Sequence, residues 1–171
     1  MGLGRPAKIR LAIGVVVAVA AAVVALVLVS GKPATAPAAH ARVYLNTTAC
    51  LLTNPSGVAP GGPGAPVWAA MQKASVKTHV MVSYLPATGP AEVPGLLNSL
   101  VERRCGVIVA TGTAPDRIAA AAKANPHQQF ILVVTPGTAA GPLTPNTQAV
   151  SAADAPARIG QAIQTLAAHA E

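Results

Sequence analysis

Small polar side chains follow three apolar, β-branched runs of the sequence, at the points where those runs end. Hydroxyl and amide groups can hydrogen-bond a neutral polar ligand, and nearby helix N-termini would add backbone N–H donors for an anionic one. Threonine is also common at strand ends and helix caps for backbone reasons alone, so a purely structural role stays open. The candidate ligand-binding residues are Thr53, Asn54, Ser56, Thr111, Gly112, Thr113 and Thr135.

The loop after the first run, residues 54–66, is rich in glycine and proline and leads into a helix-like segment. A strand, a glycine-rich turn and a helix N-terminus often hold phosphate, because free backbone N–H groups point at the ligand. Four prolines remove N–H donors from this loop, and no Gly-Lys-Ser/Thr follows it. We therefore predict no phosphate cradle, with Asn54 and Ser56 as the remaining polar contacts of the loop.

Groups suited to catalysis or metal binding are sparse after residue 42. The acidic residues are scattered, and His79, His127 and His169 stand alone, without H-E-x-x-H or Cys-x-x-Cys spacing. Ser56 lies in Pro-Ser-Gly and lacks the G-x-S-x-G elbow of serine hydrolases. We therefore expect a protein that is not an enzyme and that uses no metal and no cofactor.

Five apolar runs alternate with helix-like segments. Two of the runs are apolar throughout, which is typical of parallel strands covered on both faces. The alternation predicts one three-layer, Rossmann-like α/β domain with a mostly parallel five-stranded sheet in the order 2-1-3-4-5. Ligands of such sheets bind beyond the carboxyl ends of the strands. In this strand order the site is the switch point between strands 1 and 3, from which the chain connections run in opposite directions. The predicted strands are residues 49–53, 79–85, 106–111, 130–135 and 147–151.

Four helices are expected between and after these strands. The clearest pattern covers residues 92–104, with one apolar stripe and two arginines at the end. A helix closing before Pro126 is predicted to open with a capping box formed by Thr113 and Asp116. Further helices are expected over residues 67–76 and from about residue 154. Trp68 and Phe130 are predicted to lie in the core.

The two cysteines, Cys50 and Cys105, begin the first and third predicted strands. In the order 2-1-3-4-5 these strands are parallel neighbours, so the two Cα atoms can fall within the roughly 4.4–6.8 Å that a disulfide needs. Disulfides persist outside the cytoplasm. We expect a Cys50–Cys105 disulfide, and a pair of small buried thiols stays open as the alternative.

The N-terminal part of the chain has the pattern of a membrane anchor. Residues 11–29 are 19 consecutive residues without a charge or a proline, enough at about 1.5 Å per residue to span the hydrocarbon core of a bilayer. Arg5, Lys8 and Arg10 precede this stretch and Lys32 alone follows it closely, which places the N-terminus in the cytoplasm.

These signals divide the chain into four predicted parts: a basic cytoplasmic N-terminus (1–10), a transmembrane signal anchor (11–30), a Pro/Ala-rich tether (31–41) and an extracytoplasmic domain (42–171). The protein would be a single-pass protein of the cell membrane. Ala39, His40 and Ala41 have the small-x-small form of a cleavage site, so secretion after signal-peptide cleavage is the alternative.

The net charge of +7 does not indicate nucleic-acid binding. Four of the 12 cations flank the N-terminal apolar segment, and only the pair Arg103 and Arg104 forms a basic run in the domain. Aromatic residues, on which bases stack, make up 2% of the chain. We therefore exclude nucleic acid as a partner.

Four stretches of the chain together resemble the basic-membrane-protein family of ABC-transporter substrate-binding proteins: CLLTNPSGV, APVWAAMQKAS, CGVIVATGTAPDRIAAAAKANPHQQFILVV and NTQAVSAADAPARIGQAI. The resemblance covers residues 49–168 and only the N-terminal lobe. It implies a type 1 periplasmic-binding-protein fold, of which two lobes close on a ligand that is often a nucleoside. Thr53, Asn54 and Trp68 match the ends of the family's first loop, but small residues over 59–65 replace its polar middle.

The sequence thus favours a membrane-anchored, extracytoplasmic solute-binding or sensing module for a small polar or nucleoside-like ligand. The alternative is a structural or protein-interaction module that has lost ligand binding. In that case the exposed face of the lobe would bind a protein partner or a second copy of the chain.

Overall fold

The computed structural model describes residues 43–137 and 139–170. The chain divides into two units, Met1–Ala41 and Arg42–Glu171, and the described residues all belong to the second unit. The predicted cytoplasmic segment, signal anchor and tether lie outside the described residues. In the part of the chain that is described, no helix is both long and apolar enough to cross a membrane.

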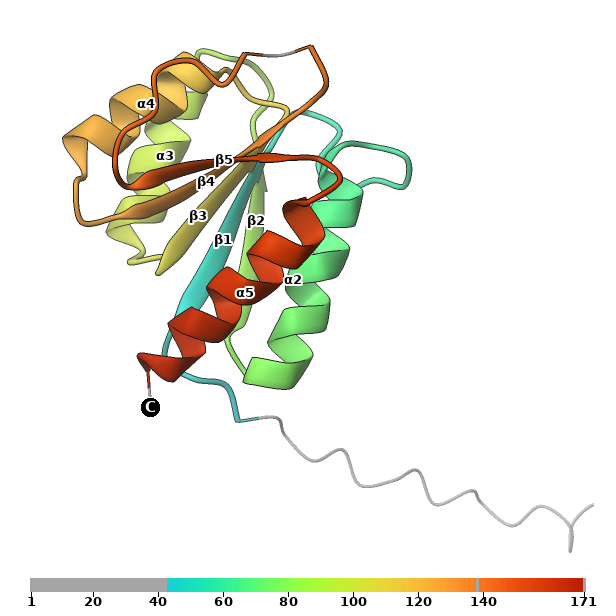
Figure 1. Ribbon diagram of the computed structural model, residues 1–171. Helices are drawn as coiled ribbons and strands as arrows, with labels where there is room; N and C mark the ends of the chain where they lie inside the picture. Colours follow the sequence, from blue (N-terminus) through green and yellow to red (C-terminus); the bar gives the residue numbers. More distant parts are fainter. Residues whose placement is uncertain (1–42, 138, 171) are drawn as a thin grey trace, which may run out of the picture. The chain divides into compact units, whose positions relative to one another are not determined.

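The domain is built on one five-stranded sheet in which all strands run parallel (Figure 1). The strand order is β2-β1-β3-β4-β5, as predicted. All strands therefore begin at one edge of the sheet, called the amino edge below, and end at the other, called the carboxyl edge. The strands are β1 Thr48–Thr53, β2 Met81–Pro86, β3 Val107–Thr111, β4 Gln129–Val134 and β5 Thr147–Ser151.

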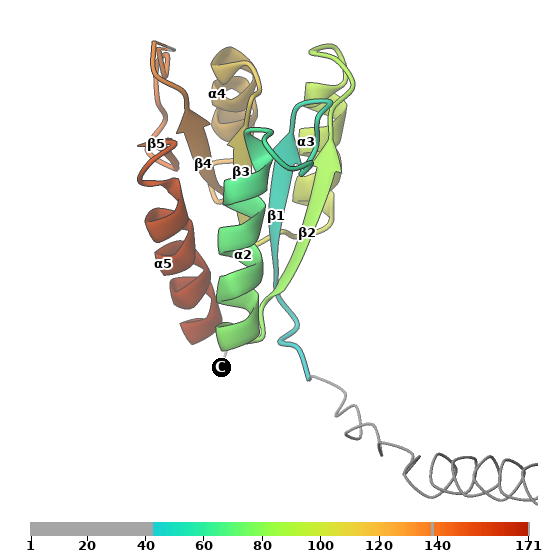
Figure 2. The ribbon, with the colours of Figure 1, turned by 90° about the vertical axis from the view of Figure 1, so that its right-hand side faces the viewer.

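Two helices cover each face of the sheet. Figure 2 shows α2 and α5 on one face and α3 and α4 on the other. Each crossover helix returns the chain to the start of the next strand, so the helices begin near the carboxyl edge and end near the amino edge. The helices are α2 Gly64–Thr78, α3 Val93–Glu102, α4 Pro115–Ala124 and α5 Ala155–Ala168.

Successive residues of the central strands enter two separate cores, because side chains alternate along a strand. Ala49 and Leu51 of β1 belong to the core under α2 and α5, whereas Cys50 and Leu52 belong to the core under α3 and α4. All residues of β3 are buried. Burial on both faces accounts for the nearly continuous apolar sequence of the central strands.

The two aromatic residues predicted as core differ in burial. Phe130 is 1% exposed, as expected. Trp68 is only half-buried, and its ring meets that of Tyr84 edge-to-face with centroids 5.2 Å apart. Tyr84 lies on β2, the outermost strand on that side, so this aromatic pair is at the border of the core.

Cys50 and Cys105 form a disulfide, with their Cα atoms 5.8 Å apart. Cys50 lies within β1, and Cys105 lies just before β3, its neighbour in the sheet. Both residues are buried in the core under α3 and α4. The sequence separation of 55 residues corresponds to a loop-closure contribution of about 4 kcal/mol to the free energy of unfolding.

The predicted capping box of α4 is wrong. The N-cap of this helix is Ala114, and no side chain caps it. Pro115 explains the shift, because a proline holds the preceding residue in an extended conformation (ψ of Ala114 is 123°) and itself suits the first helical position. Thr113 therefore precedes the cap, and its hydroxyl is not used by the helix.

Candidate functional site

The predicted ligand residues lie mainly at the carboxyl edge of β1, β3 and β4. Thr53 ends β1 and Thr111 ends β3. The strand register pairs Leu52 with Ala110, so these two threonines occupy neighbouring positions at the edge. Thr135 follows β4 and is exposed. The parallel sheet thus brings to one edge residues that are far apart in the sequence.

The loops after β1 and β3 touch directly through Asn54 and Gly112. Gly112 has a φ of +65°, a conformation that costs little only for glycine. A Cβ atom at this position would lie 3.2 Å from Cβ, Cγ and Nδ2 of Asn54. Both the backbone conformation and the close approach therefore require glycine between Thr111 and Thr113.

Three polar atoms around this contact are buried without a hydrogen-bond partner among the described residues: Asn54 Oδ1, Thr111 Oγ1 and Thr113 Oγ1. A buried polar group without a partner costs about 1–3 kcal/mol, so such groups are rare in native proteins and mark places of functional interest. Asn54, Thr111 and Thr113 are called the strand-edge cluster below.

The strand-edge cluster lies just below the surface. Thr111 is 1% exposed, whereas Asn54 and Thr113 are half-buried and Gly112 between them is exposed. Buried amides elsewhere in the described chain are satisfied; Nδ2 of Asn146, for example, donates to three backbone carbonyl oxygens. The missing partners are therefore a property of this edge and not of the domain as a whole.

The other predicted residues of the first loop have structural roles or face solvent. Thr53 is fully buried, and its hydroxyl donates to the carbonyl oxygen of Asn54 at 3.1 Å. Ser56 is exposed, and its carbonyl oxygen accepts a hydrogen bond from the N–H of Ala59 at 3.1 Å. The structure thus separates Thr53 and Ser56 from the strand-edge cluster.

The glycine-proline loop folds into successive tight turns. The N–H groups of Gly57, Ala59, Gly62 and Ala65 each donate to the carbonyl oxygen three residues earlier. A side chain at Gly64 would collide with the carbonyl of Gly57, so the loop packs closely against the start of α2. These four donors are used within the loop and do not point at a ligand.

The acidic side chains near the carboxyl edge are engaged locally. Thr88 donates its hydroxyl and its N–H to the Glu92 carboxylate at 2.6 and 3.1 Å. These hydrogen bonds, the side-chain one first, lower the pKa of Glu92. Ser151 donates to Asp154 at 2.7 Å. Within residues 43–137 and 139–170, no three His, Cys, Asp or Glu residues are grouped to hold a metal ion.

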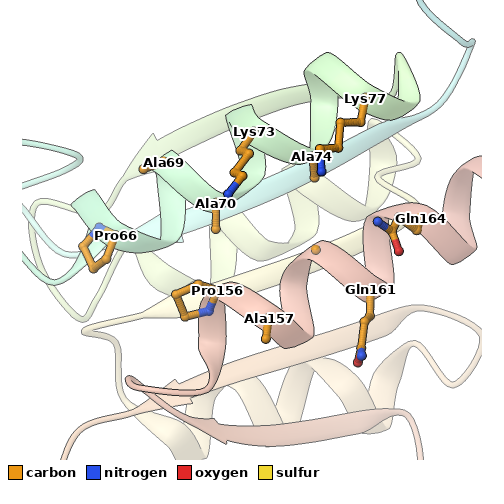
Figure 3. Close-up of a pocket in the computed structure, with 11 residues that line it drawn as sticks. Pro66, Ala69, Ala70, Lys73, Ala74, Lys77, Pro156, Ala157, Gln161 and Gln164 are labelled. Carbon is orange, nitrogen blue, oxygen red and sulfur yellow. The ribbon is translucent and has the colours of Figure 1, made fainter.

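A groove of about 600 Å³ runs between α2 and α5 on the opposite side from the disulfide core (Figure 3). Small side chains form its floor, and the lysines and glutamines on its flanks are polar at their tips. None of the predicted ligand residues lines it. The groove was not predicted, because it depends on the first and last helices of the domain, which are far apart in the sequence, lying side by side. Its lining is Pro66, Ala69, Ala70, Lys73, Ala74, Lys77, Pro156, Ala157, Gly160, Gln161 and Gln164.

The chain matches no protein-family model and no curated protein sequence. Its fold is shared with a fragment of a provisionally assigned lipoprotein from Peptoclostridium difficile 630, at a TM-score of 0.58 and 16% identity, over 71% of this chain and 97% of the fragment. This likeness concerns the α/β fold alone.

Two solute-binding proteins give TM-scores of 0.48. One is an ABC transporter solute-binding protein from Aeropyrum pernix K1, 15% identical over 60% of this chain and 28% of that protein. The other is the 5-methylthioribose transporter solute-binding protein from Thermotoga lettingae TMO in complex with 5-methylthioribose, 12% identical over 71% of this chain and 46% of that protein. This chain therefore spans less than half the length of either protein, and membership of the basic-membrane-protein family stays a prediction.

Proposed function

We propose that this protein is a membrane-anchored, extracytoplasmic module that binds or senses a small polar solute at the carboxyl edge of β1 and β3. The observation that carries the proposal is the strand-edge cluster, with three buried polar atoms that lack partners among the described residues. These atoms are buried, so a solute would reach them when the loops after β1 and β3 move apart, and its hydrogen bonds would then offset the cost of burying them. The edge is also the place where sheets of this strand order bind ligands.

The chemistry of the cluster favours a neutral solute. Asn54 Oδ1 can only accept a hydrogen bond, whereas the hydroxyls of Thr111 and Thr113 can donate or accept. None of the three side chains is charged, and four N–H groups of the first loop, those of Gly57, Ala59, Gly62 and Ala65, donate within turns. A ligand with several hydroxyl or amide groups, such as a nucleoside or a sugar, meets this pattern.

Two features support the extracytoplasmic placement. The sequence carries the pattern of a signal anchor before the domain. The disulfide between Cys50 and Cys105 is of the kind that persists in oxidising compartments. Together they favour a solute-binding domain that is held outside the cytoplasm.

The test is a thermal-unfolding screen of the full-length protein, in detergent, against neutral nucleosides, sugars and amino acids. A solute at about 100 times its Kd should stabilise the folded state by about 2.7 kcal/mol. Asn54→Ala should abolish the shift by removing an acceptor of the cluster. Thr165→Ala, on the exposed surface of α5, is the matched control and should leave the shift intact.

A screen in which no solute raises the Tm, or in which Asn54→Ala responds as fully as the control, would contradict the proposal. Association that depends on protein concentration, in the absence of any solute effect, would support the alternative of an interaction module. Sedimentation velocity of the same sample measures that association directly.

A further inference from the structure

The charged residues of the domain are divided between the two edges of the sheet. Near the carboxyl edge, three carboxylates (Glu92, Asp116 and Asp154) accompany two cations, Arg117 and Arg158. At the amino edge the balance among residues 43–137 and 139–170 is reversed, with four exposed cations and one carboxylate, Glu102. The four cations are Lys77, Arg103, Arg104 and Lys123.

Helix dipoles account for only part of this asymmetry. Lys77 and Lys123 lie in the last turns of α2 and α4, where a cation complements the partial negative charge of the helix end. Arg103 and Arg104 follow the end of α3, and Arg104 has a left-handed φ of 56°. Within the described part of the chain neither arginine forms an ion pair, so both are available to an external anion.

Arg104 also lines a cavity at this edge. The cavity has a volume of about 480 Å³ and lies between the end of α3 and the turn after α4. His127 and Gln128 from that turn contribute to its lining, and Gln128 Nε2 donates to the carbonyl oxygen of Gly106 at 3.5 Å. Arg103 and Lys123 adjoin residues that line it. A phosphate-sized anionic group would thus find both a recess and cations here.

Large apolar side chains are exposed at the same edge. Val43 is 83% exposed and Val76 55%, and Tyr44 and Met81 are exposed to a smaller degree. Their segments are adjacent, because Leu45 N–H donates to the His79 carbonyl at 2.8 Å and Met81 N–H to the Thr47 carbonyl at 3.0 Å. Cations beside exposed aliphatic and tyrosine side chains are the composition of surfaces that lie at a membrane interface.

We infer that the amino edge is a docking surface for anionic phospholipid. Charge complementarity favours this occupant, and so does the place where the chain enters the domain. Residue 43 lies at the amino edge, and the predicted apolar stretch ends at residue 29. The intervening residues reach at most about 50 Å when fully extended, so a predicted anchor at residues 11–29 would keep the amino edge within that distance of the lipid. The inference rests on the membrane attachment in the proposed function and not on the solute site.

The experiment uses the full chain in vesicles of phosphatidylcholine alone or of equal parts phosphatidylcholine and phosphatidylglycerol. Trp68→Phe combined with Tyr44→Trp moves the single indole of the chain to the amino edge. Brominated lipids should quench this indole strongly in the anionic vesicles, weakly in the neutral ones, and weakly in both at high salt. The native Trp68, at the start of α2, should not be quenched.

Charge variants in the same background test the cations. Each neutralised cation should lower the ratio of docked to undocked protein about fivefold, so Arg103→Gln with Arg104→Gln should lower it about 25-fold. Arg117→Gln with Arg158→Gln makes the same change of charge at the other edge and should have no effect. Quenching that is equal in the two lipids, or that the Arg103 and Arg104 changes do not reduce, would overturn the inference.

Separate measurements distinguish this inference from the proposed function. Alkaline carbonate extraction reports membrane anchoring, and the solute-induced Tm shift reports the strand-edge cluster. If alkaline carbonate releases the chain from the vesicles, the chain is not anchored, and co-sedimentation with the same two kinds of vesicle then replaces the quenching measurement. Binding to the anionic vesicles alone then supports docking, and binding to neither refutes it.

Discussion

Replacing Thr111 by valine should stabilise the unliganded protein and weaken solute binding. Thr111 is 1% exposed at the end of β3, and its hydroxyl has no partner among the described residues. Valine has the same shape and suits a buried strand, so the change removes an unsatisfied hydroxyl without creating a cavity. Most point substitutions reduce stability or leave it unchanged, so a gain is a distinctive result.

The magnitude follows from the cost of an unsatisfied buried hydroxyl, about 1–3 kcal/mol. Partial relaxation of the half-buried surroundings reduces the expected gain to about 1–2 kcal/mol, or roughly 4–8 °C in Tm for a domain of this size. The loss of one hydrogen bond to a solute should weaken binding by about 5–30-fold.

The assay is thermal unfolding of wild type and Thr111→Val, with and without the solute identified by the screen. Thr165→Val, an exposed position on α5, is the matched control and should change the Tm and the affinity little. A decrease in Tm for Thr111→Val would refute the reasoning, because it would show that the hydroxyl has a hydrogen-bond partner in the folded protein. A gain in Tm with unchanged affinity would place the solute elsewhere.

Three further predictions concern the fold around the site. Gly112→Ala should lower the free energy of unfolding by about 1–2 kcal/mol, because alanine is strained at a φ of +65° and its Cβ would crowd Asn54. The control is Gly95→Ala, at an open position in α3. In the same denaturant titration it should raise the free energy of unfolding by up to about 1 kcal/mol. Cys105→Ser should cost about 4 kcal/mol through the lost cross-link, and a urea midpoint equal to that of wild type would show that the bond contributes nothing. The pKa of Glu92 lies below its usual value because of the hydrogen bonds from Thr88. The stability it contributes is present above the unfolded-state pKa and is lost as pH falls through the folded-state pKa; in an NMR titration, Thr88→Val should move the pKa of Glu92 upward.

Much of the fold could be predicted from the sequence because the central strands are buried on both faces. Such strands are apolar throughout, and their alternation with amphipathic segments leaves few topologies. The ends of the elements were less predictable. The second strand starts at Met81 and not at residue 79, because His79 adopts a left-handed φ of 59° and closes α2. Glycine is the usual left-handed residue at the end of a helix and marks that end in a sequence, whereas a histidine at the same position does not.

The candidate site was predictable as a location and not as a set of atoms. The strand ends marked the carboxyl edge, but the sequence does not distinguish Thr53, whose hydroxyl bonds the adjacent carbonyl, from Thr111, whose hydroxyl has no such partner. The sequence pattern predicts a capping box at Thr113, but Pro115 at the first helical position makes Ala114 the N-cap and leaves the Thr113 hydroxyl outside the helix. Which polar atoms are satisfied depends on local turns and on a contact between two distant loops.

The two proposed surfaces follow from one property of a parallel sheet with crossover helices. All strands end at one edge, so polar residues from separate loops gather there, and all helices end at the other, so their terminal cations gather there. A six-residue strand such as β1 separates the two edges by about 20 Å. If the amino edge rests on lipid, the strand-edge cluster points away from the bilayer, toward the compartment from which a solute arrives. In that arrangement, the same topology that brings Asn54, Thr111 and Thr113 to one edge would also keep them clear of the membrane.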